Sequence, residues 1–133
     1  MEKITVSSSQ RQELVDITSR VMEIAGKMGW KEGVLIVFCP HTTAGITINE
    51  SADPSVSRDI NSVLTRLVPE KDKYEHLEGN SDAHVKSSLL GCSEFLILQG
   101  GKPVLGTWQG LFFAEFDGPR SRKVYLQFCP GGD

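Results

Sequence analysis

Apolar residues alternate with polar residues, or gather in short apolar runs, in segments spread along the whole chain. Period-two alternation and runs rich in β-branched and aromatic residues are typical of strands. The continuously apolar run at residues 33–39 indicates a buried strand. Together these patterns predict strands over residues 3–8, 12–18, 33–39, 44–50, 94–99, 107–117 and 122–129.

The segment at residues 18–30 has the period of an amphipathic helix instead. Its apolar residues recur at i, i+3, i+4 and i+7, the spacing that places them on one face. Thr18 can cap the start of this helix, and Gly29 lies where a C-cap glycine belongs. The stripe consists of Val21, Ile24, Ala25 and Met28.

Residues 53–69 give the clearest helix pattern of the chain. Asp53 can accept the free N–H groups of the first turn, and Pro54 suits the first helical position because it lacks an N–H group. A polar loop follows, and a third, shorter helix is predicted over residues 82–90, ended by Gly91. The apolar stripe of the long helix is Val56, Ile60, Val63, Leu64 and Leu67.

The predicted order of elements is therefore ββαββααβββ, without strict alternation of strands and helices. This order is typical of an α+β domain with a mainly antiparallel sheet or sandwich and about three helices. The chain has 133 residues, which predicts a single domain over residues 1–133.

Composition and charge exclude several classes of protein. The chain is 39% hydrophobic and 23% charged, with a net charge of −3 and no sustained basic face, which argues against nucleic-acid binding. The longest uncharged run, at residues 33–49, is too short and too polar for a membrane span, and the N-terminal segment lacks an apolar signal. The three cysteines form no C-x-x-C pair, which predicts reduced thiols in a cytoplasmic protein.

The chain has three histidines, His41, His76 and His84, and each lies among carboxylates and amides. A single histidine is more often a surface or hydrogen-bonded polar residue than a ligand. Three histidines among carboxylates and amides could supply the three protein ligands of a catalytic zinc site, with water in the fourth position.

Other polar groups could bind an anion. Asn80 and Ser81 precede the third helix, whose first N–H groups would point at a phosphate, although a plain helix cap explains them as well. Arg120 and Arg122 lie in a predicted turn and could hold a phosphate, or Arg120 could pair with Asp117 in a solvated turn.

Two further motifs admit two interpretations each. Trp108 and Gln109 lie between glycines, where they could stack on a flat ring and hydrogen-bond its edge, or form part of the core. Cys39 and His41 could be a nucleophile and its base, but Cys39 ends an apolar run, which favours a buried, unreactive thiol.

Three blocks of this sequence resemble the secondary thiamine-phosphate synthase family of the YjbQ type. They are FCPHTTAGITINESADPSVSRDI, HLEGNSDAHVKSSLLG and GTWQGLFFAEFDGPRSR, in this order, and the similarity covers nearly the whole chain. Cys39 and Cys92 are not part of the family pattern, which weakens the cysteine-nucleophile interpretation.

The resemblance implies a compact α+β homotrimer with weak thiamine-phosphate synthase activity. This reaction joins an aminopyrimidine methyl diphosphate to a thiazole phosphate and releases diphosphate. The resemblance implies a metal or an anion near His41, His76 and His84. We expect a divalent metal, with zinc as the expected ion, bound by these three histidines. The other candidate residues also match the family's motifs. For the reaction that the resemblance implies, we expect catalytic roles for Glu50, His84, Trp108 and Gln109, and contacts to a phosphorylated substrate from Asn80, Ser81, Asp82, Arg120 and Arg122.

We therefore expect a cytoplasmic, homotrimeric enzyme that acts on a small phosphorylated substrate. Two alternatives stay open. The chain could be a trimeric, non-catalytic module that binds a phosphorylated metabolite, or a metal-dependent hydrolase of a phosphate ester or amide.

Overall fold

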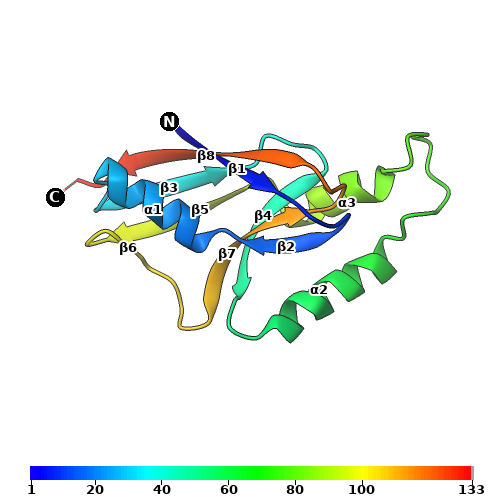
Figure 1. Ribbon diagram of the computed structural model, residues 1–133, viewed down its shortest axis with the longest axis horizontal. Helices are drawn as coiled ribbons and strands as arrows, with labels where there is room; N and C mark the ends of the chain where they lie inside the picture. Colours follow the sequence, from blue (N-terminus) through cyan, green and yellow to red (C-terminus); the bar gives the residue numbers. More distant parts are fainter. Residues whose placement is uncertain (133) are drawn as a thin grey trace.

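Two antiparallel sheets form the body of the computed structural model, which describes residues 1–132 (Figure 1). The strands are β1 (Glu2–Ser7), β2 (Glu13–Asp16), β3 (Gly33–Phe38), β4 (Ala44–Glu50), β5 (Ser93–Gln99), β6 (Lys102–Pro103), β7 (Gln109–Glu115) and β8 (Ser121–Pro130). The large sheet has the order β1-β8-β3-β5-β6, and the small sheet has the order β2-β7-β4. All pairings are antiparallel, so the predicted α+β class is confirmed.

The helices are α1 (Thr18–Met28), α2 (Pro54–Leu67) and α3 (Ser81–Leu90). Each predicted helix and strand is present in the structure. The additional strand β6 has two residues, too few to give any periodic pattern. The strand predicted from residue 107 begins at Gln109, so Trp108 lies in the loop that precedes β7.

The helix ends agree with the prediction at two caps and differ at a third. Asp53 caps α2 by accepting the Ser55 N–H at 2.9 Å, and Gly29 ends α1 in the left-handed conformation, with φ of 70°. Thr18, however, is the first helical residue of α1 and not its cap. Its N–H donates to the Asp16 carboxylate at 2.9 Å, so Asp16 supplies the acceptor that Thr18 was expected to provide.

The core lies between the two sheets and under α1. Inward-facing side chains alternate with outward-facing ones along β1, β3 and β5, as a half-buried strand requires. Fully burying one such aliphatic or aromatic side chain contributes about 1.5–3 kcal/mol. The largest apolar contributors include Ile17, Leu35, Ile46, Leu96, Leu98, Leu111, Phe113 and Leu126.

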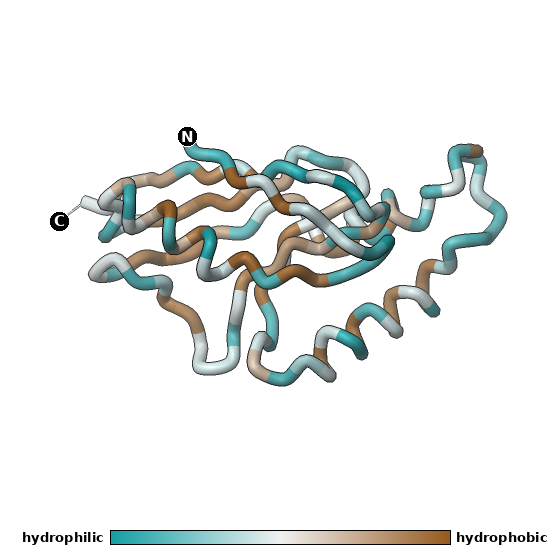
Figure 2. The backbone as a smooth tube through the Cα atoms, in the orientation of Figure 1, coloured by the Kyte–Doolittle hydropathy of each residue, from teal (hydrophilic) through white to brown (hydrophobic). Residues whose placement is uncertain are grey.

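The predicted apolar stripe of α2 is only partly covered. Leu64 is buried in a small second cluster with Ala83, Ala114 and Phe116, but Leu67 is 69% exposed. Figure 1 shows the reason, because α2 diverges from the sheets, and Figure 2 shows brown, apolar positions along it. Within residues 1–132, no helix is both long and apolar enough to span a membrane.

The end of α3 is held tightly against β4, and this contact positions the site described below. The Ser87 hydroxyl donates to the Ala44 carbonyl at 2.6 Å, and the Ile46 N–H donates to the Gly91 carbonyl at 3.1 Å. A Cβ atom on Gly45 would lie 2.7 Å from that carbonyl oxygen, so only glycine allows the two backbones to approach this closely.

Candidate functional site

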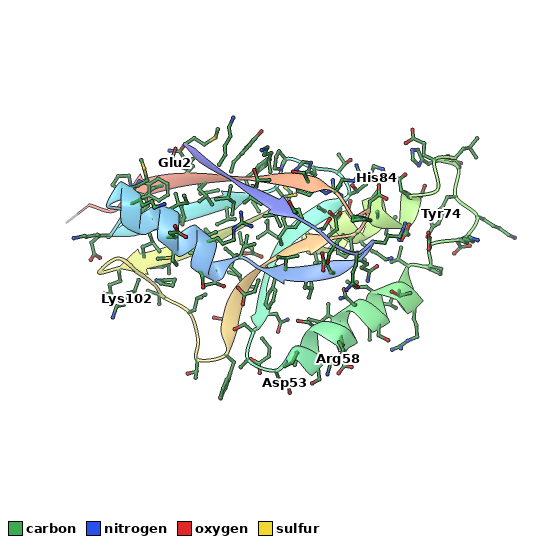
Figure 3. The ribbon with its side chains drawn as sticks, viewed as in Figure 1. Glu2, Asp53, Arg58, Tyr74, His84 and Lys102 are labelled. Atoms are coloured by element: carbon green, nitrogen blue, oxygen red, sulfur yellow. The ribbon has the colours of Figure 1, made fainter. Side chains whose placement is uncertain are left out.

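Three segments that are distant in sequence line one hydrophilic pocket of about 440 Å³, called here the polar pocket. They are the β3–β4 bend, the start of α3 with the loop before it, and the turn between β7 and β8 (Figures 1 and 3). The lining residues are Pro40, His41, Thr42, Thr43, Glu78, Asn80, His84, Asp117, Arg120 and Arg122. The pocket thus brings together five predicted site residues, His41, Asn80, His84, Arg120 and Arg122.

His41 is held as a neutral donor by its backbone contact. Its Nε2 atom accepts the Lys123 N–H at 2.9 Å, so the ring proton of the neutral form lies on Nδ1. Burial lowers the pKa of His41 below its ordinary value, and the nearby charge of Arg122 lowers it further. The residue is therefore uncharged near neutral pH and offers an N–H group.

His76 and His84 lie close together. Their ring centroids are 5.4 Å apart with the planes at 77°, and His76 Nδ1 is 3.1 Å from the Ser81 hydroxyl. Among residues 1–132, however, no group of three or more His, Cys, Asp or Glu side chains is placed to hold a metal ion. The Nε2 lone pair of His41 is also already occupied. The residues of one chain thus do not fit the predicted zinc site as they stand.

Arg122 has a structural partner that the sequence analysis missed. It is only 3% exposed, and its guanidinium donates to the Glu115 carboxylate and, at 2.8 Å, to the Thr43 hydroxyl. Burial raises the pKa of Glu115, but hydrogen bonds from Arg122 and Ser8 outweigh this effect and lower it overall. The sequence contained one signal for this pair: Glu115 is the only charged residue in the apolar segment LFFAEF. A carboxylate buried in such a segment requires a cation as its partner.

Arg120 forms an exposed ion pair with Asp117, which was one of the two arrangements predicted for it. Its Nη2 atom lies 3.0 Å from Asp117 Oδ2, and its side chain is 50% exposed. Asp117 also accepts a hydrogen bond from the Asn80 side-chain amide at 2.9 Å. Arg120 therefore keeps donors free for a ligand at the mouth of the polar pocket.

Asn80 carries an acceptor that nothing in the described chain satisfies. It occupies the N-cap position of α3, but its side chain makes no capping hydrogen bond. Its Oδ1 atom is buried and has no hydrogen-bond partner among residues 1–132. A buried unpaired acceptor is costly, so this atom is suited to a donor group on a ligand.

Asp82 does not lie where its predicted role requires. It is fully buried, outside the lining of the polar pocket, and binds Lys86 at 2.8 Å and Arg11 at 2.9 Å. Burial raises its pKa, and the hydrogen bonds from the two cations outweigh this effect and lower it. Asp82 thus has a structural role in two ion pairs, and its predicted contact with substrate stays a prediction. Ser81 is also buried and outside the lining, and it orients His76.

The remaining predicted residues form a separate cluster at the far end of β4 and β7, called here the ring pocket. Its volume is about 470 Å³, and its lining is Ile48, Asn49, Glu50, Trp108 and Gln109. Trp108 is 63% exposed, which excludes the interpretation as a core tryptophan. Glu50 Oε2 is buried without a partner in the described chain.

The predicted catalytic set is consequently divided within one chain. Glu50, Trp108 and Gln109 line the ring pocket, whereas His84 lines the polar pocket, and the two linings share no residue. Figure 3 places His84 on α3 and Asp53, three residues after Glu50, at the opposite end of β4.

A third hollow adjoins the polar pocket. This apolar pocket of about 800 Å³ shares Pro40, His41, Thr42 and His84 with it. Its other lining residues are Phe38, Cys39, Ser87, Ser88, Gly91 and Cys92. Burial raises the pKa of the Cys39 thiol to about 11, so the thiol is predominantly protonated and weakly reactive near neutral pH.

Comparison with known proteins identifies the family. The model of the UPF0047 protein YjbQ-like family matches residues 2–131. The chain belongs to the YjbQ/UPF0047 family. UPF0047 protein MJ1081 of Methanocaldococcus jannaschii is 54% identical over 94% of this chain and 91% of its own length. UPF0047 protein YugU of Bacillus subtilis is 43% identical over 96% of this chain and 97% of its own length.

Solved structures that are similar to this chain in sequence have the same fold. A YjbQ/UPF0047 protein of Clostridium acetobutylicum superposes with a TM-score of 0.94 at 48% identity, covering 97% of this chain and 100% of that one. The protein APE1520 of Aeropyrum pernix gives a TM-score of 0.93 at 34% identity, with 98% of both chains covered. These names describe a family and a fold, and they assign no reaction.

Proposed function

We propose that the polar pocket binds a small phosphorylated metabolite and that the protein is a transferase of the thiamine-phosphate synthase type. The observation that carries the proposal is the convergence of His41, His84, Asn80 and Arg120 on one pocket from three distant segments. The resemblance of the three sequence blocks supplies the reaction.

In this proposal the chain's own groups bind the departing diphosphate. Arg120 donates to its oxygens through the guanidinium N–H groups that Asp117 leaves free. His41 donates its Nδ1 proton, because its other ring nitrogen already accepts the Lys123 N–H. These donors stabilise the charge that develops as the carbon–oxygen bond to diphosphate breaks.

The ring pocket is proposed as a separate subsite for a flat, amino-substituted ring. It lies at the other end of β4, roughly 20 Å along the strand, so it does not hold the ring of a molecule whose diphosphate occupies the polar pocket of the same chain. Trp108 presents an exposed ring face for stacking, and Glu50 Oε2 offers a buried acceptor for an amino group. Gln109 also lines this pocket. Its Oε1 atom already accepts the Gly106 N–H at 2.8 Å, so its side-chain NH2 group is the part left for a ligand. Zinc at the histidines stays a prediction, and no step of this proposal depends on it.

The decisive experiment combines binding with turnover. Calorimetric titration with thiamine phosphate and with the two precursors measures affinity, and product analysis measures synthesis. Arg120→Gln is expected to weaken phosphate binding by about 10–100-fold, the value of a charged hydrogen bond of about 1.5–3 kcal/mol. Arg58→Gln, on α2 and outside all three pockets, is the matched control. Absence of both binding and synthesis in the wild type would overturn the proposal.

The second candidate is a non-catalytic module for a phosphorylated metabolite. The observation that favours it is the buried ion pair of Arg122 with Glu115. Because Glu115 neutralises its charge, Arg122 adds little stabilisation to the charge of a transition state. Binding without synthesis in the same experiment would support this module over the transferase.

We further propose that copies of this chain associate, as the resemblance to a homotrimeric family implies. The support is an exposed apolar surface on the large sheet, called here the outer face. It consists of side chains between 37% and 65% exposed, namely Val34, Ile36, Phe38, Phe95 and Ile97. An exposed patch of this kind marks an interaction surface in a soluble protein.

A further inference from the structure

Cys39 and Cys92 lie directly opposite each other on neighbouring segments of the large sheet. The ladder of β3 and β5 pairs Phe38 with Ser93, and the Cys39 N–H donates to the Cys92 carbonyl at 2.7 Å. The two cysteines therefore extend the ladder by one antiparallel pair. Opposite residues in such a pair have Cα atoms about 4.5–5.5 Å apart and side chains on the same face.

This separation lies within the range that a disulfide spans, about 4.4–6.8 Å between Cα atoms. Both residues line the apolar pocket, so both border the same open space. Both thiols are free in this structure. Opposite residues have Cβ atoms about 4.5–5.5 Å apart and a disulfide holds them at about 3.5–4.5 Å, so closing the bridge requires side-chain rotation and a small approach of the two segments.

We propose that Cys39 and Cys92 form a reversible disulfide in the wall of the apolar pocket. Cys92 is exposed and meets the oxidant first, whereas Cys39 is buried beside it and acts as the resolving thiol. The oxidant is a small-molecule disulfide. Formation of the bridge transfers two electrons to this molecule and releases it as two thiols.

The two steps balance. The Cys92 thiolate attacks one sulfur of the small disulfide, which gives a mixed disulfide on Cys92 and one free small thiol. Burial keeps most of the Cys39 thiol protonated, so the small fraction that has lost its proton to water attacks the Cys92 sulfur slowly and displaces the second small thiol. A dithiol and a disulfide have become a protein disulfide and two small thiols.

The bridge would act on the site because of where its two ends lie. Cys39 is two residues before His41, and Cys92 follows directly after Gly91 and α3, which carries His84. Both histidines belong to the pocket wall that the bridge would cross. Formation of the bridge itself does not depend on the proposed function.

The test is oxidation of the intact protein with excess oxidised glutathione near neutral pH. Peptide mapping under non-reducing conditions should show a Cys39–Cys92 linkage, and added thiol should reverse it. Cys129→Ser should behave as the wild type, because Cys129 is exposed on β8 and lines none of the three pockets. Cys39→Ala should instead stop at a glutathione adduct on Cys92.

A wild-type protein that keeps Cys39 free while Cys92 retains glutathione would overturn the proposal. Linkage between two chains through Cys92 or Cys129 would overturn it as well. Both results are read in folded wild-type protein, so they do not depend on how well any variant folds. Neither result bears on phosphate binding, which the calorimetric titration tests separately.

Discussion

Buried charges, more than exposed ones, hold the polar pocket in shape. Glu115 and Arg122 join the β7 and β8 walls, and Asp82 joins α3 to the N-terminal half of the chain through Arg11. Arg120 and Asp117, at the mouth of the same pocket, are much more exposed. The two kinds of pair should therefore respond differently to mutation.

Replacing Arg122 with Leu should lower the free energy of unfolding by about 3–5 kcal/mol, because it leaves the Glu115 carboxylate buried without its cation. The measurement is urea denaturation at neutral pH. Arg120→Leu is the matched control, since breaking an exposed pair costs about 1 kcal/mol or less. Equal losses for the two variants would contradict the buried pairing.

His41 should titrate below 6.5, its ordinary pKa, because burial disfavours the imidazolium. NMR of the ring nitrogens should also show the proton on Nδ1 in the neutral form. A folded pKa at or above 6.5 would contradict the effect of burial, and a neutral ring with its proton on Nε2 would contradict the hydrogen bond from the Lys123 N–H.

The same shift has a consequence for stability. Since the unfolded chain binds this proton more readily than the folded one, His41 should reduce stability as the pH falls below about 6.5. Urea midpoints from about pH 8 to about pH 5 should therefore drop more in the wild type than in His41→Gln, which cannot titrate. Parallel curves for the two proteins would argue against the shift.

At the scale of elements, local chemistry predicted most of the fold. Asp53 and Pro54 predicted the start of α2, and the apolar run at residues 33–39 predicted β3. Both predictions succeeded because caps and periodicity depend on only a few neighbouring residues. Thr18 was wrongly predicted as the cap, because Asp16, two residues upstream, supplies the acceptor. Asp and Thr are both common capping residues, so the sequence alone does not show which of them caps the helix. The exposure of Leu67 was missed because the divergence of α2 depends on tertiary contacts.

Removing the α2 cap should cost measurable stability. Asp53→Ala deletes the acceptor of the Ser55 N–H and should lower the free energy of unfolding by about 0.5–2 kcal/mol. Asp59→Ala, an exposed position within the same helix, should change it by less than about 0.5 kcal/mol. Circular dichroism during urea titration measures both, and identical values would show that the cap contributes nothing.

At the scale of the molecule, the sequence indicated residues that line pockets in the structure but not how these residues are grouped. His41, His84 and Arg120 share a pocket because α3, the β3–β4 bend and the β7–β8 turn meet at one end of the sheets. Glu50 and Trp108 lie at the other end of β4, and no spacing along the chain reveals this division. Only the register of β4 against β7 determines it.

The outer face should set the oligomeric state. Phe95→Lys combined with Ile97→Lys places two charges where apolar side chains now meet solvent, and these charges should prevent association. Light scattering is expected to give a trimer for the wild type and a monomer for this double variant. Met28→Lys, on α1, should remain trimeric. A monomeric wild type would contradict association, and a trimeric double variant would contradict the use of this face.

The pairing of β1 with β8 joins the two ends of the chain. β1 is an edge strand, and its register runs from Glu2 opposite Leu126 to Ser7 opposite Ser121. During synthesis the first strand therefore emerges from the ribosome long before the strand that it pairs with. Contacts this distant in sequence slow folding. The large sheet can be completed only after β8 has been made, so the nascent protein must remain soluble with that sheet unfinished.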